Sequence, residues 1–259
     1  MTRVTKPIQL AVLVVSVLTP MIADTTSVVL IRSPNQLVLA ADSLRTFEPV
    51  ESGKERVFNA CKIHVANNFA FSADGTTIAS KFSLDAVRTT SEILAEGGTL
   101  DAKAHRIATK LKGPLLRTLV WSRSNMDPTR YAKNVLPMPA NLSIVIAGVE
   151  SGLLQFATID FERRDDSKGT PVTINAVVDS CAKESCNNDG IQYRMFGFMN
   201  AAKARVDADK HFFTKDLVSD ASRLIEIEIK DAPDAVGPPI SIISIDVMGL
   251  HWLANSCRE

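Results

Sequence analysis

Two short apolar runs, Ser27 to Ile31 and Leu37 to Ala41, constrain the fold of this chain more than any other feature. Both are rich in Val, Leu and Ile, and residues 32–36 between them contain a Pro-Asn turn signal, so the pattern predicts a β-hairpin. Neither run alternates apolar with polar residues. We therefore expect both faces to be buried, as in a sheet between another sheet and helices. Such a hairpin also returns Asp42 to the neighbourhood of Thr26.

The residues before the first run have the pattern of a secretory signal peptide. Arg3 and Lys6 precede an almost wholly apolar stretch from Ile8 to Ile22, which matches a charged n-region and a short h-region. The stretch is short for a membrane span, and Ala23 is a small residue before a cut. We expect residues 1–23 to be a signal peptide, the protein to be secreted or periplasmic, and no stable membrane association after leader removal. An uncleaved anchor is the alternative.

The rest of the pattern predicts a single α+β domain over residues 24–259, since no repeat or composition shift marks a second domain. The expected elements, in chain order, are a loop at 46–56, a hairpin of 56–65 with 68–73, helices at 76–95 and 100–120, strands at 142–149, 153–160 and 171–177, helices at 192–206 and 214–229, and a terminal hairpin within 240–253. Gly113-Pro114 is expected to interrupt the second helix.

Charge and cysteine content limit the classes of function. Lys plus Arg and Asp plus Glu both number 29, so no global field marks nucleic acid as a partner. Cys181 and Cys186 form the preferred disulfide of an exported chain, Cys257 is a further candidate, and Cys61 lies in an apolar strand pattern; free thiols are the alternative. A single C-x4-C and four scattered histidines argue against zinc. We expect no metal and no cofactor.

Thr25 and Thr26 stand directly behind the leader, at the start of the first apolar run. If the leader and any residues left behind it are removed, a threonine becomes the first residue of the mature chain. Its hydroxyl is then a candidate nucleophile and its free α-amine a candidate base, because an α-amine has a pKa of about 7.7 to 8.0. The residues alone do not decide which of the two threonines is the nucleophile.

Several segments together resemble a proteasome-type β subunit: Thr25 to Ile31, Leu37 to Ser43, Cys61 to Val65, Phe71 to Gly75 and, in mid-chain, Leu142 to Val149. Proteins of that family are N-terminal-nucleophile (Ntn) threonine hydrolases. The resemblance implies a four-layer αββα sandwich with the nucleophile at one end of the central sheets. It also implies a ring-like assembly as a possible homo-oligomer.

The resemblance assigns catalytic roles to Thr26, Asp42 and Lys62. Counting back from Asp42, it favours Thr26 over Thr25 as the nucleophile, and Lys62 matches the family's lysine. The positive charge of Lys62 would favour the neutral amine and the developing alkoxide, and Asp42 would hold and neutralise that lysine. A backbone N–H of Asp74 or Gly75, opening the helix expected from residue 76, would stabilise the oxyanion.

Three features depart from the family pattern. The oxyanion turn reads Ala73-Asp74-Gly75, which adds a carboxylate, no Gly-Ser signature is evident near Gly190 to Gly197, and the segment Asp234 to Gly237 lacks the family's helper serine. In addition, a cut after Ala23 leaves two residues ahead of Thr26, which self-cleavage or trimming must remove.

The sequence therefore predicts an exported, proteasome-like threonine-type hydrolase that cleaves peptide or other amide bonds through Thr26, freed by processing. The alternative is a catalytically inactive proteasome-like structural subunit or binding module, which a mature N-terminus upstream of Thr26 would favour. A different exported hydrolase is a third hypothesis, but the sequence contains no G-x-S-x-G elbow, H-E-x-x-H motif or Ser-His-Asp spacing to recommend it.

Overall fold

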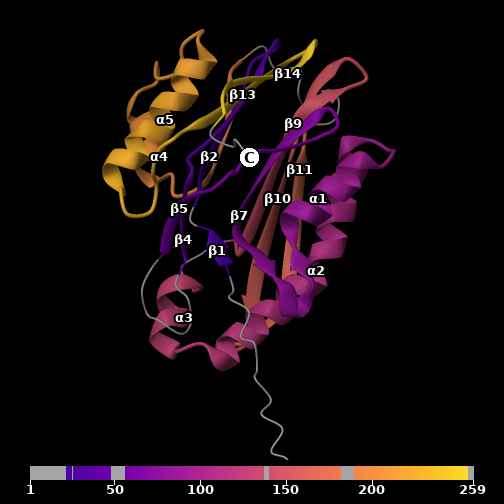
Figure 1. Cartoon of the computed structure of the whole chain (residues 1–259), viewed down its shortest axis with the longest axis vertical. Helices are drawn as coiled ribbons and strands as arrows, with labels where there is room; N and C mark the ends of the chain where they lie inside the picture. Colours follow the sequence, from indigo (N-terminus) through magenta and orange to yellow (C-terminus); the bar gives the residue numbers. More distant parts are fainter. Residues whose placement is uncertain (1–21, 25, 48–55, 137–139, 182–189, 256–259) are drawn as a thin grey trace, which may run out of the picture.

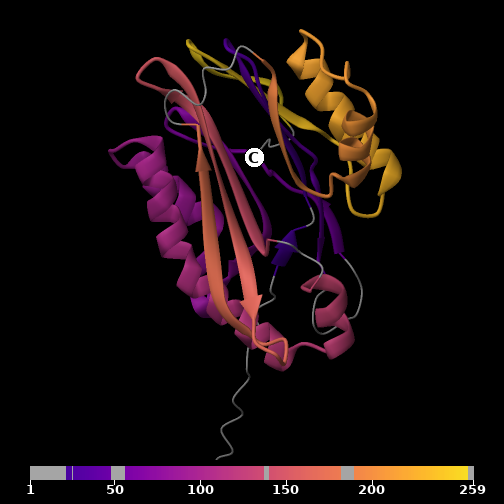
Figure 2. The same ribbon diagram turned by 180° about the vertical axis from the view of Figure 1, so that it is seen from behind.

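The computed structural model describes residues 22–24, 26–47, 56–136, 140–181 and 190–255. Two antiparallel β-sheets pack against each other, and two groups of helices lie on opposite sides of the molecule (Figure 1, Figure 2). The predicted mixture of antiparallel strands and helices is therefore confirmed at the level of fold class.

Among the described residues, the larger sheet has seven strands, and every pairing in it is antiparallel. Its main path runs β1 (Ile22–Asp24), β7 (Phe69–Ala79), β9 (Leu142–Glu150), β10 (Leu153–Asp165) and β11 (Pro171–Ser180), and β6 (His64–Ala66) and β8 (Leu84–Asp85) also pair with β7. The meander predicted over 142–177 is confirmed.

The smaller sheet has five strands, again all antiparallel. Their order is β12 (Gln192–Gly197), β2 (Ser27–Arg32), β3 (Leu37–Ala41), β13 (Ser241–Asp246) and β14 (Gly249–Ala254). A separate pair joins β4 (Leu44–Phe47) and β5 (Arg56–Asn59). The predicted β2–β3 hairpin and the C-terminal hairpin are both confirmed.

The helices divide between the two sheets. They are α1 (Ala86–Ala95), α2 (Leu100–Asn125), α3 (Pro128–Asn134), α4 (Asn200–Ala208) and α5 (Leu217–Asp231), with a 3₁₀ turn, η1, at Ser80–Phe82. Apolar side chains of α1 and α2 share a buried cluster with the larger sheet, and those of α4 and α5 share one with the smaller sheet. Figure 2 shows the same separation from behind.

Strand β2 explains why two apolar runs organise the molecule. Val28 and Leu30 point into a cluster between the two sheets, whereas Val29 and Ile31 point to the cluster with α4 and α5. Every residue of β2 and of β3 is buried. The sequence-based expectation that both faces of this hairpin are covered is therefore confirmed.

The predicted helix over 76–95 is wrong in its first half. β7 continues as a strand to Ala79, and α1 begins only at Ala86, where the side chain of Asp85 accepts a hydrogen bond from the N–H of Arg88. Threonines at 76 and 77 followed by Ile78 favour an extended chain. Asp85 is in turn a good helix N-cap, so the helix starts ten residues later than the sequence pattern indicated.

The predicted helix over 192–206 is also wrong in its first part. Residues 192–197 form β12, which pairs with β2, and α4 begins at Asn200. Tyr193 and Met195 alternate along β12 and pack with the α4–α5 cluster. The period of two, ended by Gly197 at a φ of 75°, is typical of a strand.

Two further expectations need correction. Helix α2 is not interrupted at Gly113-Pro114 but runs through to Asn125, because buried Leu111 and Leu115 hold it on the sheet despite the lost backbone hydrogen bond. The segment 56–65 is not one strand of a hairpin, since 56–59 pair with β4 and only 64–66 pair with β7. Part of the loop expected at 46–56 is therefore strand, while residues 48–55 lie outside the described ranges.

Candidate active site

Thr26 lies where the chain passes from the larger sheet to the smaller one. Asp24 pairs with Gly75 of β7, and three residues later Ser27 pairs with Gly197 of β12. Thr26 is fully buried, and among the described residues its Oγ1 has no hydrogen-bond partner. The hydroxyl that the sequence predicts as a nucleophile therefore sits unpaired at the crossing between the sheets.

Asp42 and Lys62, the other two predicted catalytic residues, form a buried ion pair with 2.8 Å between Nζ and Oδ1. Their side chains are 0% and 1% exposed. The carboxylate of Asp42 also accepts hydrogen bonds from three backbone N–H groups, those of Ser27 (2.9 Å), Leu44 (3.1 Å) and Gly237 (3.2 Å). A buried carboxylate requires this degree of pairing. The structure thus brings Asp42 and Lys62 together and ties them to the residue that follows Thr26.

The last residue of β12 and the residue that follows it lie on the other side of this crossing. Phe198 N donates to the carbonyl oxygen of Thr26 at 2.9 Å, and the hydroxyl of Ser27 donates to the carbonyl oxygen of Phe198. A methyl group on Gly197 would lie only 1.7 Å from the Thr26 oxygen. Glycine is therefore required here by both its φ and the close approach.

Sequence reasoning missed the roles of Gly197 and Phe198 because it assigned both to a helix. The alternation of Tyr193 and Met195 ahead of the glycine was the available signal for a strand. For Gly237, the sequence indicated only that its segment lacks the family's helper serine. In the fold, this glycine binds Asp42, and its carbonyl accepts the N–H of Ser43 at 3.1 Å.

The predicted oxyanion turn has a different structure. Asp74 and Gly75 lie inside β7, opposite Ser143 and Leu142 of β9, so they do not open a helix. The N–H of Thr76 donates to the carbonyl of Asn141 at 2.8 Å and is not free to bind an oxyanion. The helix-terminus argument for oxyanion binding is therefore wrong.

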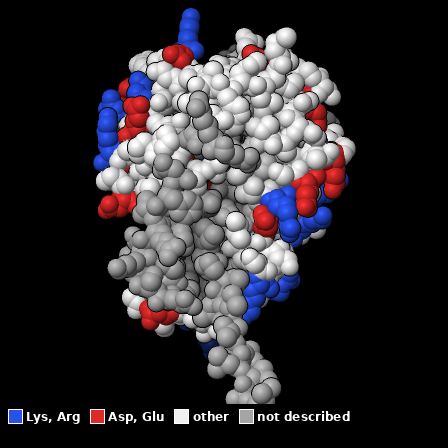
Figure 3. Space-filling view, in the orientation of Figure 1, with Lys and Arg blue, Asp and Glu red and all other residues white. Residues whose placement is uncertain are grey.

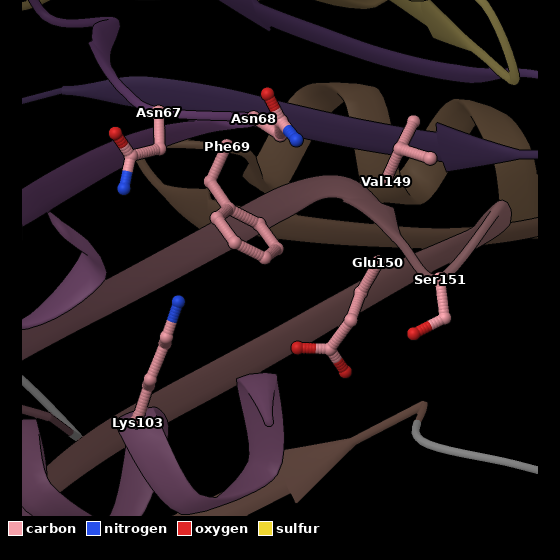
Figure 4. A pocket seen from close by; sticks show the side chains of 7 residues that line it. All are labelled: Asn67, Asn68, Phe69, Lys103, Val149, Glu150 and Ser151. Carbon is pink, nitrogen blue, oxygen red and sulfur yellow. The ribbon is translucent and has the colours of Figure 1, made fainter. Parts of the chain in front are cut away.

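A pocket of about 420 Å³ lies at the opposite end of β7 (Figure 4), and its lining includes Lys103 and Glu150. The ammonium of Lys103 donates to the carbonyl of Leu94 at 3.1 Å, in the last turn of α1. Glu150 accepts the N–H of Leu100, the first residue of α2, at 2.9 Å. Each charge thus complements a helix end, which is an ordinary structural role. This pocket contains none of the predicted catalytic residues.

Cys61 and Cys181 are both disulfide-bonded, so the described part of the chain has no free cysteine. The free-thiol alternative is wrong for these two residues, and Cys61 is not simply an apolar strand residue. Cys186 lies outside the described residues. Its pairing with Cys181 therefore stays a prediction.

Three further observations concern surface charge, metal binding and membrane spanning. On the face shown in Figure 3, basic and acidic side chains lie beside one another rather than in a patch of one sign. Within the described ranges, no three His, Cys, Asp or Glu side chains are grouped so as to hold a metal ion, and no helix has the length and apolarity needed to cross a membrane.

Comparison with known proteins places the fold. The sequence matches no protein-family model and no curated protein sequence. The structure is similar to a subunit of the helical assembly of the Anbu complex from Pseudomonas aeruginosa, with a TM-score of 0.54 and 12% identity over 89% of this chain and 87% of that one. It is also similar to eukaryotic HslV from Trypanosoma brucei, with a TM-score of 0.45 and 13% identity over 85% and 99% of the two chains.

The likeness to the Anbu subunit concerns the fold alone, because the sequences share so few residues. It supports a proteasome-like arrangement of two antiparallel sheets with helices.

Proposed function

We propose that the chain is an Ntn threonine hydrolase with a four-layer αββα fold, which cleaves peptide or other amide bonds through Thr26. The observation that carries the proposal is the unpaired, buried hydroxyl of Thr26 next to Ser27, whose N–H binds the Asp42 carboxylate of the Asp42–Lys62 pair. The three separate core clusters support the four layers, two between sheet and helices and one between the sheets.

The reaction follows from these groups. Once residues 1–25 are removed, the neutral α-amine of Thr26 takes the proton of Oγ1 while Oγ1 attacks the substrate carbonyl. The resulting tetrahedral oxyanion collapses, the C–N bond breaks, and the leaving nitrogen takes the proton from the amine. Water then hydrolyses the ester on Oγ1 and restores the enzyme. The positive charge of Lys62, held by Asp42, favours the neutral amine and the alkoxide character of Oγ1.

Export and maturation belong to the same proposal. We assign residues 1–23 to a signal peptide, residues 24–259 to a single domain, and the protein to the periplasm or the exterior. The disulfide bonds of Cys61 and Cys181 support an oxidising compartment. Because β1 pairs with β7 directly ahead of the crossing, the residues before Thr26 must leave before the hydroxyl can meet a substrate, by self-cleavage or trimming.

The alternative is a catalytically inactive subunit that serves in an assembly. One observation favours it: the segment 234–237, which contacts Asp42 through Gly237, has no serine, and buried Val236 stands there instead. The Anbu neighbour forms a helical assembly, and a homo-oligomer or ring of this chain fits either alternative.

The test is the mature N-terminus together with Thr26→Ala. We expect N-terminal sequencing of the exported protein to begin at Thr26. Thr26→Ala should leave residues ahead of position 26 uncleaved and lower amide hydrolysis by at least about 10³-fold. Thr25→Ala is the matched control and should still mature to Thr26 with activity. A native chain that begins at Asp24 or keeps its leader would favour the inactive subunit, and loss of activity only in Thr25→Ala would move the nucleophile by one residue.

A further inference from the structure

We propose that Asp74 is the positioning residue for the α-amine of mature Thr26, holding the amine by its carboxylate and setting the pH range in which the amine can act as a base. This inference rests on the function proposed above. It assigns a role to Asp74, which in the comparison with the family is only an added carboxylate at the expected oxyanion turn.

The placement of Asp74 on β7 directs its side chain between the two sheets. Alternate residues of a strand point to opposite faces. Ala70 faces the cluster between the sheets, whereas Phe71 and Ala73 face the cluster with α1 and α2. Asp74, four residues after Ala70, shares the inner face. Its neighbour Gly75 pairs with Asp24, so Asp74 lies level with the chain that leads into Thr26.

Gly197 shows how near this carboxylate comes to Thr26. A methyl group on Gly197 would lie 3.2 Å from Asp74 Oδ2 and 1.7 Å from the carbonyl oxygen of Thr26. Both oxygens therefore border the same small space beside β12. The side chain of Asp74 occupies part of the space that a larger residue at 197 would need.

The α-amine of Thr26 faces the same space. In an extended strand the N–H and the C=O of one residue point to the same neighbouring strand. The C=O of Thr26 accepts the N–H of Phe198, so the nitrogen of Thr26 points toward that side as well. The N–H of Ser27 points the other way, to Asp42.

The charges around the amine are then distributed in a simple way. On the β3 side, the positive charge of Lys62 favours the neutral amine, and the Asp42 carboxylate paired with it at 2.8 Å opposes that effect. On the β12 side, Asp74 adds a negative charge. Gly197 and Phe198, at the end of β12, and Val236 and Gly237, before β13, are uncharged. The charged groups on the neighbouring elements are Arg194 of β12, which pairs with Asp179 at 3.1 Å, and exposed Asp234. Asp160 of β10 lies in the same cross-strand row as Asp74, with Ser143 of β9 between them, and accepts a hydrogen bond from the Ser143 hydroxyl at 2.6 Å.

A carboxylate beside an amine has two effects. It accepts a hydrogen bond, which fixes the direction of the nitrogen lone pair when the amine is neutral. It also favours the protonated amine, so the pKa of the amine is held above its ordinary value of about 7.7 to 8.0. The segment 234–237 contains no serine to orient the amine, and Asp74 supplies that polar contact from a different strand.

The first test needs no substitution. In the mature native protein, the pH dependence of α-amine acetylation by acetic anhydride, followed by mass spectrometry of the N-terminal peptide, gives the pKa of the amine. We expect a value above the ordinary range. A value within or below that range would overturn the inference.

The second test compares Asp74→Asn with the native enzyme. Asparagine keeps an oxygen acceptor and removes the charge, so we expect both the amine titration and the acidic limb of the kcat/KM profile to move to lower pH by about one unit. Glu162→Gln, an exposed carboxylate on β10, is the matched control and should move neither. Superimposable profiles for native enzyme and Asp74→Asn would show that Asp74 does not act on the amine.

The third comparison separates positioning from charge and from the proposed function itself. Asp74→Ala removes the acceptor as well, and kcat should fall at least about tenfold with little change in KM. If the amine titration shifts in Asp74→Asn but the mature chain hydrolyses no amide, the inference holds and the hydrolase function fails. If the chain is an active hydrolase lost in Thr26→Ala, yet unaffected at position 74, the function holds and the inference fails.

Discussion

At the scale of single residues, the site depends on how closely β12 approaches the first residues of β2. Gly197 permits a backbone oxygen where a Cβ would otherwise be, and Phe198 then binds the Thr26 carbonyl through its own N–H. From β2, the hydroxyl of Ser27 donates a hydrogen bond to the carbonyl oxygen of Phe198. The position of Thr26 is thus fixed by main-chain contacts on one side and by the Asp42 carboxylate on the other.

The first residue-scale prediction concerns Gly197→Ala. The added methyl group collides with the Thr26 oxygen, so β12 must move and Thr26 loses its fixed position. Gly152→Ala is a matched control, because Gly152 has the same φ of 75° but no atom within 4 Å of the new methyl group. We expect the control to lose about 1–2 kcal/mol of unfolding free energy from backbone strain alone. Gly197→Ala should lose roughly 1–3 kcal/mol more.

Urea denaturation measures the stability of both variants, and amide hydrolysis measures their activity. Gly152→Ala should keep full activity, since its turn joins β9 to β10 at the end of the sheet far from Thr26. Equal losses of stability in the two variants, with activity retained in both, would contradict the importance of the close approach.

At the scale of elements, the smaller sheet depends on how α4 and α5 are held over its outer face. Glu228 of α5 is 1% exposed and accepts the N–H of Ala202, in the first turn of α4, at 2.8 Å. This bond caps one helix from the other. Burial raises the pKa of the Glu228 carboxyl, and the hydrogen bond offsets only part of that effect. The helix pair is therefore sensitive to pH.

This sensitivity gives the element-scale prediction. A carboxyl whose pKa is raised by folding binds its proton more tightly in the folded state, so stability is lost as pH rises from the unfolded value of about 4.5 through the folded one. Glu228→Gln keeps the acceptor and cannot ionise. We expect the variant to gain stability relative to the native protein across this window, measured as unfolding midpoints between pH 4 and pH 8.

A control on the same helix isolates this effect from changes in net charge. Glu226 is an exposed glutamate two residues before Glu228, and Glu226→Gln should follow the native pH dependence. Parallel curves for Glu228→Gln and the native protein would show that the buried carboxyl does not couple α4 and α5 to pH.

At the scale of the whole molecule, the site is assembled from distant segments by two sheets and their crossing. Cys61 immediately precedes Lys62, so a disulfide bond anchors the segment that delivers the lysine. A second disulfide-bonded residue, Cys181, directly follows β11 and packs in the cluster between the sheets. One disulfide-bonded cysteine thus lies next to Lys62, and another lies in the core between the sheets.

The whole-molecule prediction is a loss of stability on reduction. A disulfide typically contributes about 2–4 kcal/mol by restricting the unfolded chain. We expect a thiol-free reductant to lower the urea midpoint, and Cys61→Ser to lower it without reductant. The variant should respond less to reductant than the native protein does. An unchanged midpoint in both experiments would show that the disulfide bonds do not stabilise the fold. They would then no longer support the proposal that the protein is exported.

The sequence determined the parts of this protein that depend on local pattern. The β2–β3 hairpin, the β9–β11 meander and the C-terminal hairpin were all predictable, because apolar periodicity and turn residues are local signals. Asp42 and Lys62 were found as a pair through the resemblance of short motifs. The beginning of α1 and the nature of residues 192–197 were not predictable in this way, because strand pairing with β1, β9 and β2 overrides weak helical spacing.

The tertiary structure alone decided what surrounds Thr26. Gly197 and Phe198 reach it from 171 or more positions away along the chain, and Asp74 points toward it only because β7 continues as a strand past the expected turn. No local pattern encodes such contacts, since they arise when two sheets pack and leave one crossing between them. The candidate nucleophile was thus predictable from the sequence, while the groups around it came from the packing of the sheets.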